Sequence, residues 1–369
     1  MNKPLLQISP YFDEQEEIEL LEVVRSIWLI ERSKNDLLEK IFSEFTGAPF
    51  SVTCSNASVG IFMSLIACGI GRASLVGSEA DEVIVPDITF VATINAILLA
   101  GARPVVVDIN EYDAHINVVN IKKAITKNTK AIMPVHLYGG MADIVAIQEL
   151  ADRNNLVIIE DAAQAVGVKL DGRHAGTFGR FGVFSLYGNK IITCGEGGIV
   201  VCQNADDRDK IYRIKNHGRL KKGAFIHEEI GYNFSFTDLQ AAVAIAQMKK
   251  INYIISRKRA INTQYRELLK NSRVSFLESP QNIDETFWFT NVLCDDAEEM
   301  ANKLAIENIQ SRRLFYPIHL QPCYKNKQLI QLDGEYNNAD KLFKRLLSLP
   351  SSVSLTADEI ESVASVIKK

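Results

Sequence analysis

LVIIEDAAQAVGVKLDGRHAGTFGRFGVFSLYGNKIITCGEGGIV, residues 156–200, is the stretch around which the rest of this chain is predicted to fold. It opens with four apolar, mostly β-branched residues, a pattern typical of a strand buried on both faces of a parallel sheet. Glu160 and Asp161 follow directly. Because the carboxyl ends of strands in a doubly wound α/β sheet open into the ligand crevice, this pattern predicts a carboxylate beside a bound ligand.

A lysine follows later in the same stretch. Residues 181–186 predict a second short buried strand, after which Lys190 lies in a turn before the glycine-rich residues 195–198. Desolvation lowers the pKa of an amine and makes it nucleophilic, so a lysine near Asp161 in a partly dry crevice suits Schiff-base chemistry. Two simpler interpretations stay open: the aspartate caps a helix, and the lysine is one solvated group among 41 basic residues.

Composition restricts the class of protein. The chain has 369 residues, enough for two lobes with separate cores, and its net charge of −4 argues against nucleic acid or an anionic membrane as a partner. The N-terminal residues lack a signal-peptide pattern, so a cytoplasmic location is expected. Without a CxxC pair, the scattered cysteines suggest neither a metal site nor disulfides; they are Cys54, Cys68, Cys194, Cys202, Cys294 and Cys323.

Helical and strand patterns alternate through the first two thirds of the chain. This alternation predicts an α/β fold with a parallel or mostly parallel sheet that helices cover on both faces. The predicted helices span residues 14–25, 35–46, 57–70, 89–101, 118–125 and 144–154, and the predicted strands span residues 50–54, 81–86, 102–109 and 131–135.

The pattern changes after residue 201. A strongly apolar helix is predicted to begin near Thr237 and Asp238, and a long basic helix over residues 252–269 is predicted to link two lobes. The rest indicates a β-hairpin and helices, and therefore a smaller α+β domain. We predict an N-terminal segment over residues 1–30, a large domain over 31–246 and a small domain over 247–369.

Nine motifs of the chain, in this order, resemble those of the DegT/StrS family of pyridoxal phosphate-dependent nucleotide-sugar aminotransferases. The resemblance covers nearly the whole chain and implies fold type I, with a mostly parallel mixed sheet in the large domain. The motifs are SNAS at residue 55, DEVIVPDITFVATINAILLAGARPVVVDI at 81, VHLYGGMAD at 135, EDAAQAVG at 160, FSLYGNKIITCGEGG at 184, NHG at 216, GYNFSFTDLQAA at 231, FYPIHLQP at 315 and SLP at 348.

The resemblance implies catalytic roles. Lys190 would form the Schiff base with pyridoxal 5'-phosphate and move a proton while the cofactor alternates with its pyridoxamine 5'-phosphate form. Asp161 would pair with the pyridine nitrogen, so that the ring accepts electrons. Gln164 would contact the ring near its 3-hydroxyl, and Phe90 would stack on the ring, although such a phenylalanine is more often a core residue.

The family also implies how the phosphate is held. Ala57 and Ser58 lie at the start of a predicted helix, where free N–H groups attract an anion, and Ser185 matches a phosphate-binding serine. Asn233 would reach the phosphate from the neighbouring subunit, which implies a homodimer with shared active sites.

Four residues match positions that line the family's substrate pocket: Trp28, Arg312, Tyr316 and His319. A partly buried, hydrogen-bonded histidine is an equal alternative for His319, and a packing role is an alternative for Trp28. Relatives usually carry a glycine where this chain has Ile27, so the turn before Trp28 is expected to differ.

The family resemblance further implies the reaction. L-Glutamate would donate its amino group to a dTDP- or GDP-linked 4-keto-6-deoxyhexose, giving a 4-amino-4,6-dideoxy sugar nucleotide for surface polysaccharide such as O-antigen. The stretch TCGEGG resembles 4-keto enzymes, because 3-keto enzymes usually carry aspartate at the position of Glu196. A 3-keto-sugar aminotransferase, an amino-acid-specific enzyme of the same fold and a non-enzymatic regulator are alternatives. A sugar dehydratase would carry histidine in place of Lys190.

Overall fold

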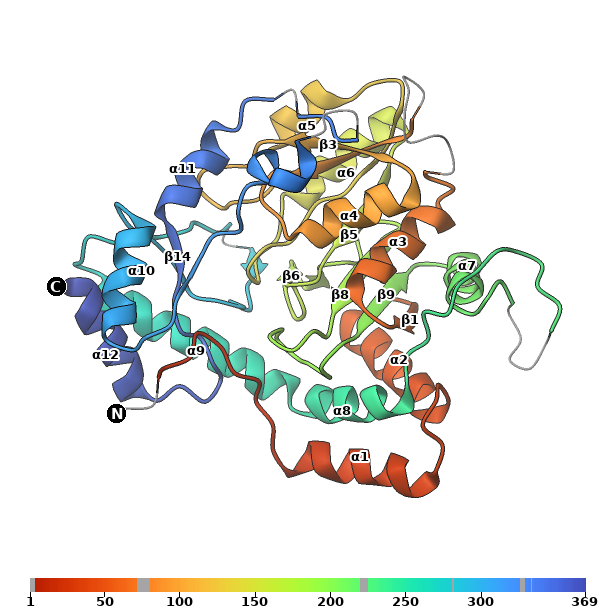
Figure 1. Cartoon of the computed structure of the whole chain (residues 1–369), viewed down its shortest axis with the longest axis horizontal. Coiled ribbons are helices and arrows are strands. Elements are labelled where there is room, and N and C mark those ends of the chain that lie inside the picture. The colour runs from red at the N-terminus through yellow and green to blue at the C-terminus, as the bar shows by residue number, and fades with distance from the viewer. Residues whose placement is uncertain (1–3, 72–79, 220–224, 281, 326–328, 333) are drawn as a thin grey trace.

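A seven-stranded sheet forms the centre of the large domain (Figure 1). The computed structural model describes residues 4–71, 80–219, 225–280, 282–325, 329–332 and 334–369. The strands are β1 (Phe50–Cys54), β2 (Glu82–Pro86), β3 (Arg103–Val107), β4 (Thr129–Ile132), β5 (Val157–Asp161), β8 (Phe181–Ser185) and β9 (Gly198–Cys202). Their spatial order is β1-β9-β8-β5-β4-β2-β3.

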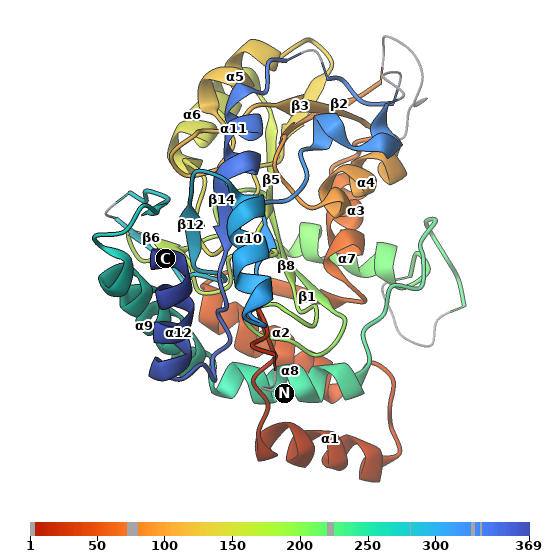
Figure 2. The ribbon, with the colours of Figure 1, turned by 60° about the vertical axis from the view of Figure 1, so that its left-hand side comes forward.

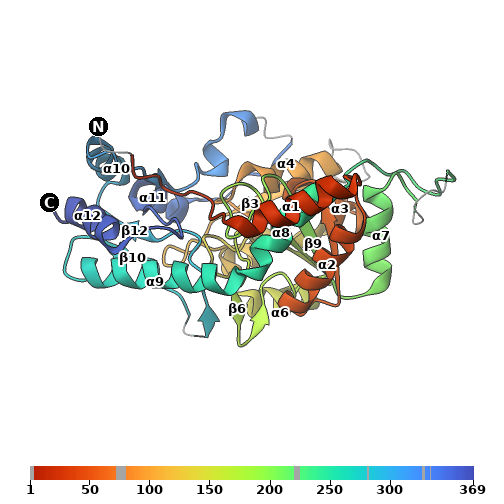
Figure 3. The ribbon, with the colours of Figure 1, turned by 90° about the horizontal axis from the view of Figure 1, so that it is seen from below.

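The sheet is mixed but mostly parallel, as predicted. Only β9 runs antiparallel to its two neighbours, β1 and β8, whereas the other neighbouring pairs of this sheet are parallel. Helices α4 and α6 lie on opposite sides of the sheet (Figures 2 and 3). The helices of this part are α1 (Glu14–Ser26), α2 (Ser33–Thr46), α3 (Ala57–Ala67), α4 (Val91–Ala100), α5 (Val118–Ala124), α6 (Ile144–Asn154), α7 (Ala205–Lys215) and α8 (Asp238–Lys249).

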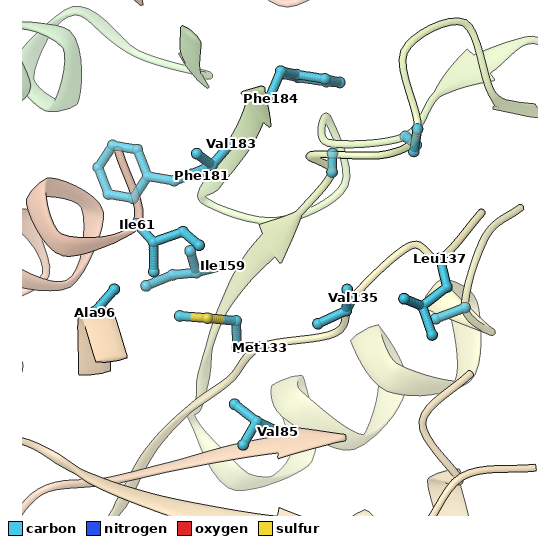
Figure 4. Packing of buried hydrophobic residues seen from close by; sticks show 14 of the residues in the cluster. Ile61, Val85, Ala96, Met133, Val135, Leu137, Ile159, Phe181, Val183 and Phe184 are labelled. Carbon is cyan, nitrogen blue, oxygen red and sulfur yellow. The ribbon is translucent and has the colours of Figure 1, made fainter. Parts of the chain in front are cut away.

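Apolar side chains of the central strands and of the covering helices form one core. Ile159 of β5 and Phe181 of β8 meet Ile61 of α3 there, and Ala96 of α4 lies nearby (Figure 4). Because helices cover both faces, every residue of β2, β8 and β9 is buried. This explains why these strands have continuous apolar runs in place of alternating patterns.

The small domain is built on an antiparallel sheet in the order β10-β12-β14-β13, with α12 packed against α9. A second hydrophobic cluster fills it and takes Tyr265 and Leu269 from α9. Ile254 and Ile255 of the same helix belong to the first cluster, and the domain boundary near residue 246 stays a prediction. The elements are α9 (Ile251–Leu269), β10 (Ser275–Phe276), β12 (Asn291–Leu293), α10 (Ala297–Ile306), β13 (Arg312–Arg313), η1 (Ile318–Leu320), η2 (Pro322–Tyr324), α11 (Asn337–Arg345), β14 (Leu346–Ser348) and α12 (Ala357–Lys368).

A small three-stranded sheet that the sequence patterns did not predict joins the two domains. A hairpin of β6 (Lys169–Leu170) and β7 (Arg173–His174) pairs with β11 (Ile283–Asp284). The turn residues Asp171 and Gly172 both have positive φ, 47° and 84°, as the two-residue Asp-Gly hairpin turn requires.

Helix α1 packs on α8 with its charged face. Glu16 and Glu19 are buried there, and Lys250 lies 2.7 Å from Glu16. The opposite face of α1 exposes the apolar residues Ile18 and Leu21, together with Val24. This distribution reverses the usual amphipathic arrangement, in which the apolar face is the buried one.

The segment before α1 runs along the small domain (Figure 1). Leu5 donates its backbone N–H to the carbonyl of Asn308, at 2.9 Å, and accepts from the N–H of Gln310. Gln7 accepts from the N–H of Ser351, at 2.8 Å. This N-terminal strap, residues 4–9, therefore connects the small domain to α1 on the large domain. In the described parts of the chain, we find no helix with the length and apolar character that a membrane span needs.

Candidate active site

Asp161 ends β5 at the carboxyl edge of the sheet. Its carboxylate accepts hydrogen bonds from the Thr93 hydroxyl, at 2.7 Å, and from the backbone N–H of Ala163, at 3.1 Å. Burial raises the pKa of Asp161, although the hydrogen bonds and the charge of Lys190 act in the opposite direction. A buried carboxylate of this kind gains from a cationic partner, which a protonated pyridine nitrogen would provide.

Lys190 lies in the turn after β8, where its backbone N–H donates to the carbonyl of Tyr187, at 2.9 Å. Part of the side chain stays accessible, but protein atoms surround the amine. Burial lowers the pKa of Lys190 to about 8; Asp161 opposes this shift and Arg312 adds to it. The fraction of free amine near neutral pH is therefore far larger than for a solvated lysine.

An anion-binding position lies next to these groups. Helix α3 begins at Ala57, and the backbone N–H groups of Ala57 and Ser58 precede its first intrahelical bond. Ser185 pairs with Gly198 in the sheet, and a Cβ on Gly198 would lie 2.6 Å from the backbone of Asn56. Glycine thus lets β9 approach the start of α3. The helix N-terminus and Ser185 lie at the same edge and together suit a phosphate.

Gln164 and Phe90 complete the predicted cofactor contacts. Gln164 is buried, and its side-chain oxygen accepts from the N–H of Tyr138, at 2.9 Å. Phe90 precedes α4, is 56% exposed and has its ring centroid 6.0 Å from that of Phe315. It is therefore not an ordinary core residue, the alternative that its sequence left open.

Glu160, the neighbour of Asp161, has a different surrounding. It is fully buried and accepts hydrogen bonds from the backbone N–H groups of Gly176, Phe178 and Gly179. The ring of His136 lies 2.8 Å from the same carboxylate. Because successive strand residues point to opposite sides, Glu160 fixes a loop behind the sheet while Asp161 is turned to the site.

The predicted substrate residues Arg312 and Tyr316 lie in the segment before η1. Arg312, on β13, is close enough to Lys190 to lower the pKa of its amine. Tyr316 is 44% exposed and packs edge-on against Phe343, with 5.3 Å between the ring centroids. The charge of Arg312 thus acts on the candidate catalytic lysine, and its substrate-binding role stays a prediction.

The imidazole of His319 is held by its own chain. Nδ1 lies 2.7 Å from the carboxylate of Asp87 and Nε2 lies 3.5 Å from that of Asp340, while the ring stacks on Tyr336. Burial alone would lower the pKa of His319, but the hydrogen bond and charge of Asp87 outweigh it and raise the pKa. Of the two alternatives for His319, these contacts match the hydrogen-bonded, partly buried histidine.

Trp28 and Asn233 line a different cleft, of about 500 Å³, together with Asn216 and Phe236. Among the described residues of one chain, the lining of this cleft includes neither Lys190 nor Asp161. Trp28 also contacts the guanidinium of Arg32, which lies 4.4 Å from the ring centroid. The two residues are therefore brought together, but not beside the lysine of their own chain.

Sequence reasoning missed three residues that shape the site: Thr93, Tyr138 and Trp288. Thr93 follows Phe90 by one turn and binds Asp161, so its place in the motif that begins at residue 81 was an available signal. The Tyr138 ring stacks on Phe315, with 5.8 Å between centroids. The Trp288 ring centroid lies 4.0 Å from the Lys190 amine. No spacing pattern links Trp288 to the lysine, because it approaches Lys190 from a distant part of the chain.

Residues 10–368 match the model of the DegT/DnrJ/EryC1/StrS aminotransferase family. The chain belongs to this family. It is 37% identical over 345 residues to a GDP-perosamine synthase of Escherichia coli O157:H7, which covers 92% of this chain and 91% of the relative. It is 34% identical over 368 residues to a GDP-perosamine synthase of Vibrio cholerae, covering 97% of each chain.

Solved structures agree with this assignment. DesV of S. venezuelae superimposes with a TM-score of 0.89 at 28% identity, over 96% of this chain and 93% of that one. PseC of Helicobacter pylori, an aminotransferase, has the same fold with a TM-score of 0.91 at 24% identity, over 99% and 98%. The family consists of sugar aminotransferases of fold type I, so the predicted fold class and the pyridoxal phosphate cofactor are confirmed.

Proposed function

We propose that this enzyme transfers the amino group of L-glutamate to the keto carbon of a nucleotide-linked 4-keto-6-deoxyhexose, with GDP as the first nucleotide to test. The similarity to two GDP-perosamine synthases, over more than nine tenths of each chain, supports this substrate class. The observation that carries the chemistry is the buried pair of Lys190 and Asp161 at one edge of the sheet.

Each residue of the site has a defined task in this proposal. Pyridoxal phosphate, when bound, supplies an electrophilic carbon and an electron-accepting ring. Lys190, with an amine pKa of about 8, would act as the nucleophile and then carry a proton. Asp161 would keep a proton on the ring nitrogen, and the start of α3 with Ser185 would hold the phosphate. Arg312 would face an acidic group of the substrate.

We further propose a homodimer with shared active sites, in which Asn233 and Trp28 act on the cofactor site of the other subunit. The segment with residues 225–230 extends from the body of the molecule beyond α7 (Figure 1) and exposes Phe225, Ile226 and Ile230. Such apolar residues on a projecting segment support burial against a second copy.

A complementation experiment tests the shared site. Lys190→Ala and Asn233→Ala would each be inactive or strongly impaired as pure proteins. After unfolding and refolding of an equal mixture, half of the dimers would be hybrids with one intact site, and about a quarter of wild-type activity would return. Activity no higher than the sum of the two pure variants would contradict the shared site.

The donor and the acceptor can be tested separately by absorbance. L-Glutamate should convert the visible band of the cofactor-bound enzyme to the near-ultraviolet band of the pyridoxamine form. The GDP-linked 4-keto-6-deoxyhexose should then restore the visible band in one turnover, while the dTDP-linked sugar serves as the comparison. A cofactor that does not respond to glutamate would contradict the donor, and the Lys190→Ala variant is the control.

NMR of the product separates the alternatives. An amine at C4 supports the proposal, whereas an amine at C3 would favour the 3-keto enzyme; transamination of amino acids alone would favour the amino-acid-specific enzyme. We propose that the amino sugar serves surface polysaccharide, including O-antigen, and is made in the cytoplasm. The similarity to relatives named GDP-perosamine synthases supports a nucleotide-linked amino sugar as the product.

A further inference from the structure

Trp288 makes two contacts with the turn that carries Lys190. The amine of Lys190 lies 4.0 Å from the centroid of the Trp288 ring, within the range of a cation–π interaction. The indole N–H of Trp288 donates to the carbonyl of Asn189, at 2.6 Å. One side chain of the 286–291 segment thus contacts both the lysine amine and the backbone beside it.

Trp288 is itself fixed by the rest of the protein. It is 2% exposed, its backbone N–H donates to the carbonyl of Tyr138 at 2.9 Å, and its ring stacks on the ring of Tyr138. Gly139 makes this approach possible, because a Cβ on Gly139 would lie 2.6 Å from the backbone nitrogen of Trp288. Trp288 is therefore held both at its backbone and at its ring.

The carbonyl of Trp288 is held by Lys258, a buried lysine of α9. The Lys258 amine donates to this carbonyl, at 3.0 Å, and to the carbonyl of Ser351. Burial lowers the pKa of Lys258 to about 7. Burial of a lysine amine costs free energy, and a hydrophobic residue would fill the space at lower cost. What the buried amine provides in return is the pair of hydrogen bonds to the carbonyls of Trp288 and Ser351.

We propose that Trp288 is a positioning residue for Lys190 and that Lys258 holds Trp288 in place. The π face of the indole favours the ammonium form of Lys190, and the bond to Asn189 fixes the turn. Asp161 and Arg312 are the charged groups that also act on this amine. The inference rests on the proposed role of Lys190, and it extends the active site to a residue on the linking helix α9.

The pKa of Lys190 in the cofactor-free protein tests the contact with Trp288. NMR of side-chain-labelled lysines gives this pKa, and Lys190→Met identifies the signal. Trp288→Leu removes the π face in a similarly apolar environment, so the pKa should fall by roughly 0.4 to 1.5 units. Trp288→Phe keeps an aromatic face but lacks the N–H, and should shift the pKa less. An unchanged pKa in both variants would overturn the proposal.

A matched pair of α9 variants tests Lys258. Lys258→Met should shift the pKa of Lys190 in the same direction as Trp288→Leu. Arg257→Met is the control, because Arg257 also joins α9 to backbone carbonyls, those of Val353 and Leu355. Arg257→Met should leave the pKa of Lys190 unchanged. Equal shifts in the two α9 variants would indicate a general loosening of the helix and would contradict a specific role for Lys258.

Peptide mapping after borohydride reduction separates this inference from the proposed function. The cofactor should be found on Lys190 in the wild type and in the Trp288 variants. A cofactor on another lysine would overturn the assignment of Lys190, and this inference with it. A cofactor on Lys190 with an unchanged pKa in the variants would overturn only the role of Trp288.

Discussion

Two adjacent carboxylates at the end of β5 have different tasks because a strand alternates its side chains. Glu160 is fixed by three backbone N–H groups and by His136, so it can serve only the fold. Asp161 is fixed by Thr93 and by one backbone N–H, and its negative charge acts to raise the pKa of the Lys190 amine. Substitutions of the two residues should therefore affect different properties.

Glu160→Gln should lower the free energy of unfolding by roughly 3 kcal/mol, because an amide cannot accept from all of these buried donors. Urea unfolding of the cofactor-free protein measures the loss. Reduction and mapping should still find the cofactor on Lys190 in the folded fraction. A variant as stable as the wild type would contradict the role given to Glu160.

Asp161→Asn should keep the fold and the bound cofactor but slow the half-reaction with glutamate by roughly 100-fold or more, because the amide does not hold a proton on the ring nitrogen. Stopped-flow absorbance measures this rate. Unfolding by urea should stay close to that of the wild type, which separates the effect from that of Glu160→Gln. An unimpaired half-reaction would argue against the pairing of Asp161 with the ring.

At the scale of elements, local sequence patterns were sufficient to predict a helix or strand wherever the element buries an apolar face of its own. The predicted helix over residues 144–154 is observed with the same bounds, and β1 agrees as well. The helix predicted to end at residue 70 ends at Ala67, because the chain turns at Gly69 with a φ of 74°. A two-residue strand such as β6 is too short to show a periodic pattern, and it forms by pairing with β11, which is distant in sequence. The sequence pattern therefore could not predict it.

The candidate site divides in the same way. Lys190, Asp161 and the start of α3 could be named as candidates from the sequence because each stands at the end of a recognisable element, and their roles stay predictions. Trp288 could not be found, because its approach depends on how the 286–291 segment packs against the 137–140 turn. Tyr138 lies in a quoted motif, but its stacking on Trp288 depends on the same packing. The contacts of His319 depend on Asp87, which is also distant in sequence.

The end of α1 places an isoleucine in a backbone conformation that favours glycine. Ile27 caps the helix with a φ of 56°, and it is 88% exposed. A β-branched residue in this left-handed region is strained, whereas glycine adopts it freely. Ile27→Gly should raise the free energy of unfolding by about 1 kcal/mol, measured by urea unfolding. Ile30→Gly, at another exposed position, is the control, and a stability loss in Ile27→Gly would contradict the strain.

At the scale of the whole molecule, the fold buries the amines of Lys190 and Lys258 and lowers their pKa values to about 8 and about 7. In the unfolded chain such amines titrate near 10.4. Between these values the unfolded state binds more protons than the folded state. Both groups therefore increase the free energy of unfolding of the cofactor-free protein as the pH rises.

Lys258→Met isolates one of these contributions. The free energy of unfolding of the wild type relative to the variant should rise by an amount on the order of 3 kcal/mol as the pH increases from about 7 to 10. Urea unfolding at several pH values measures this difference, in which other titrating groups cancel. Lys40→Met, at an exposed lysine, should show no such trend. A constant difference for Lys258→Met would mean that burial does not lower the pKa of the Lys258 amine.

The N-terminal strap has a consequence for synthesis on the ribosome. Residues 4–9 leave the exit tunnel before any other part of the chain described above, yet Leu5 and Gln7 bind the backbone near residues 308–310 and at Ser351. The nascent large domain can therefore assemble its sheet before the strap has its hydrogen-bond partners. The strap can close only after nearly the whole chain has been translated, so its pairing would be among the last steps of cotranslational folding.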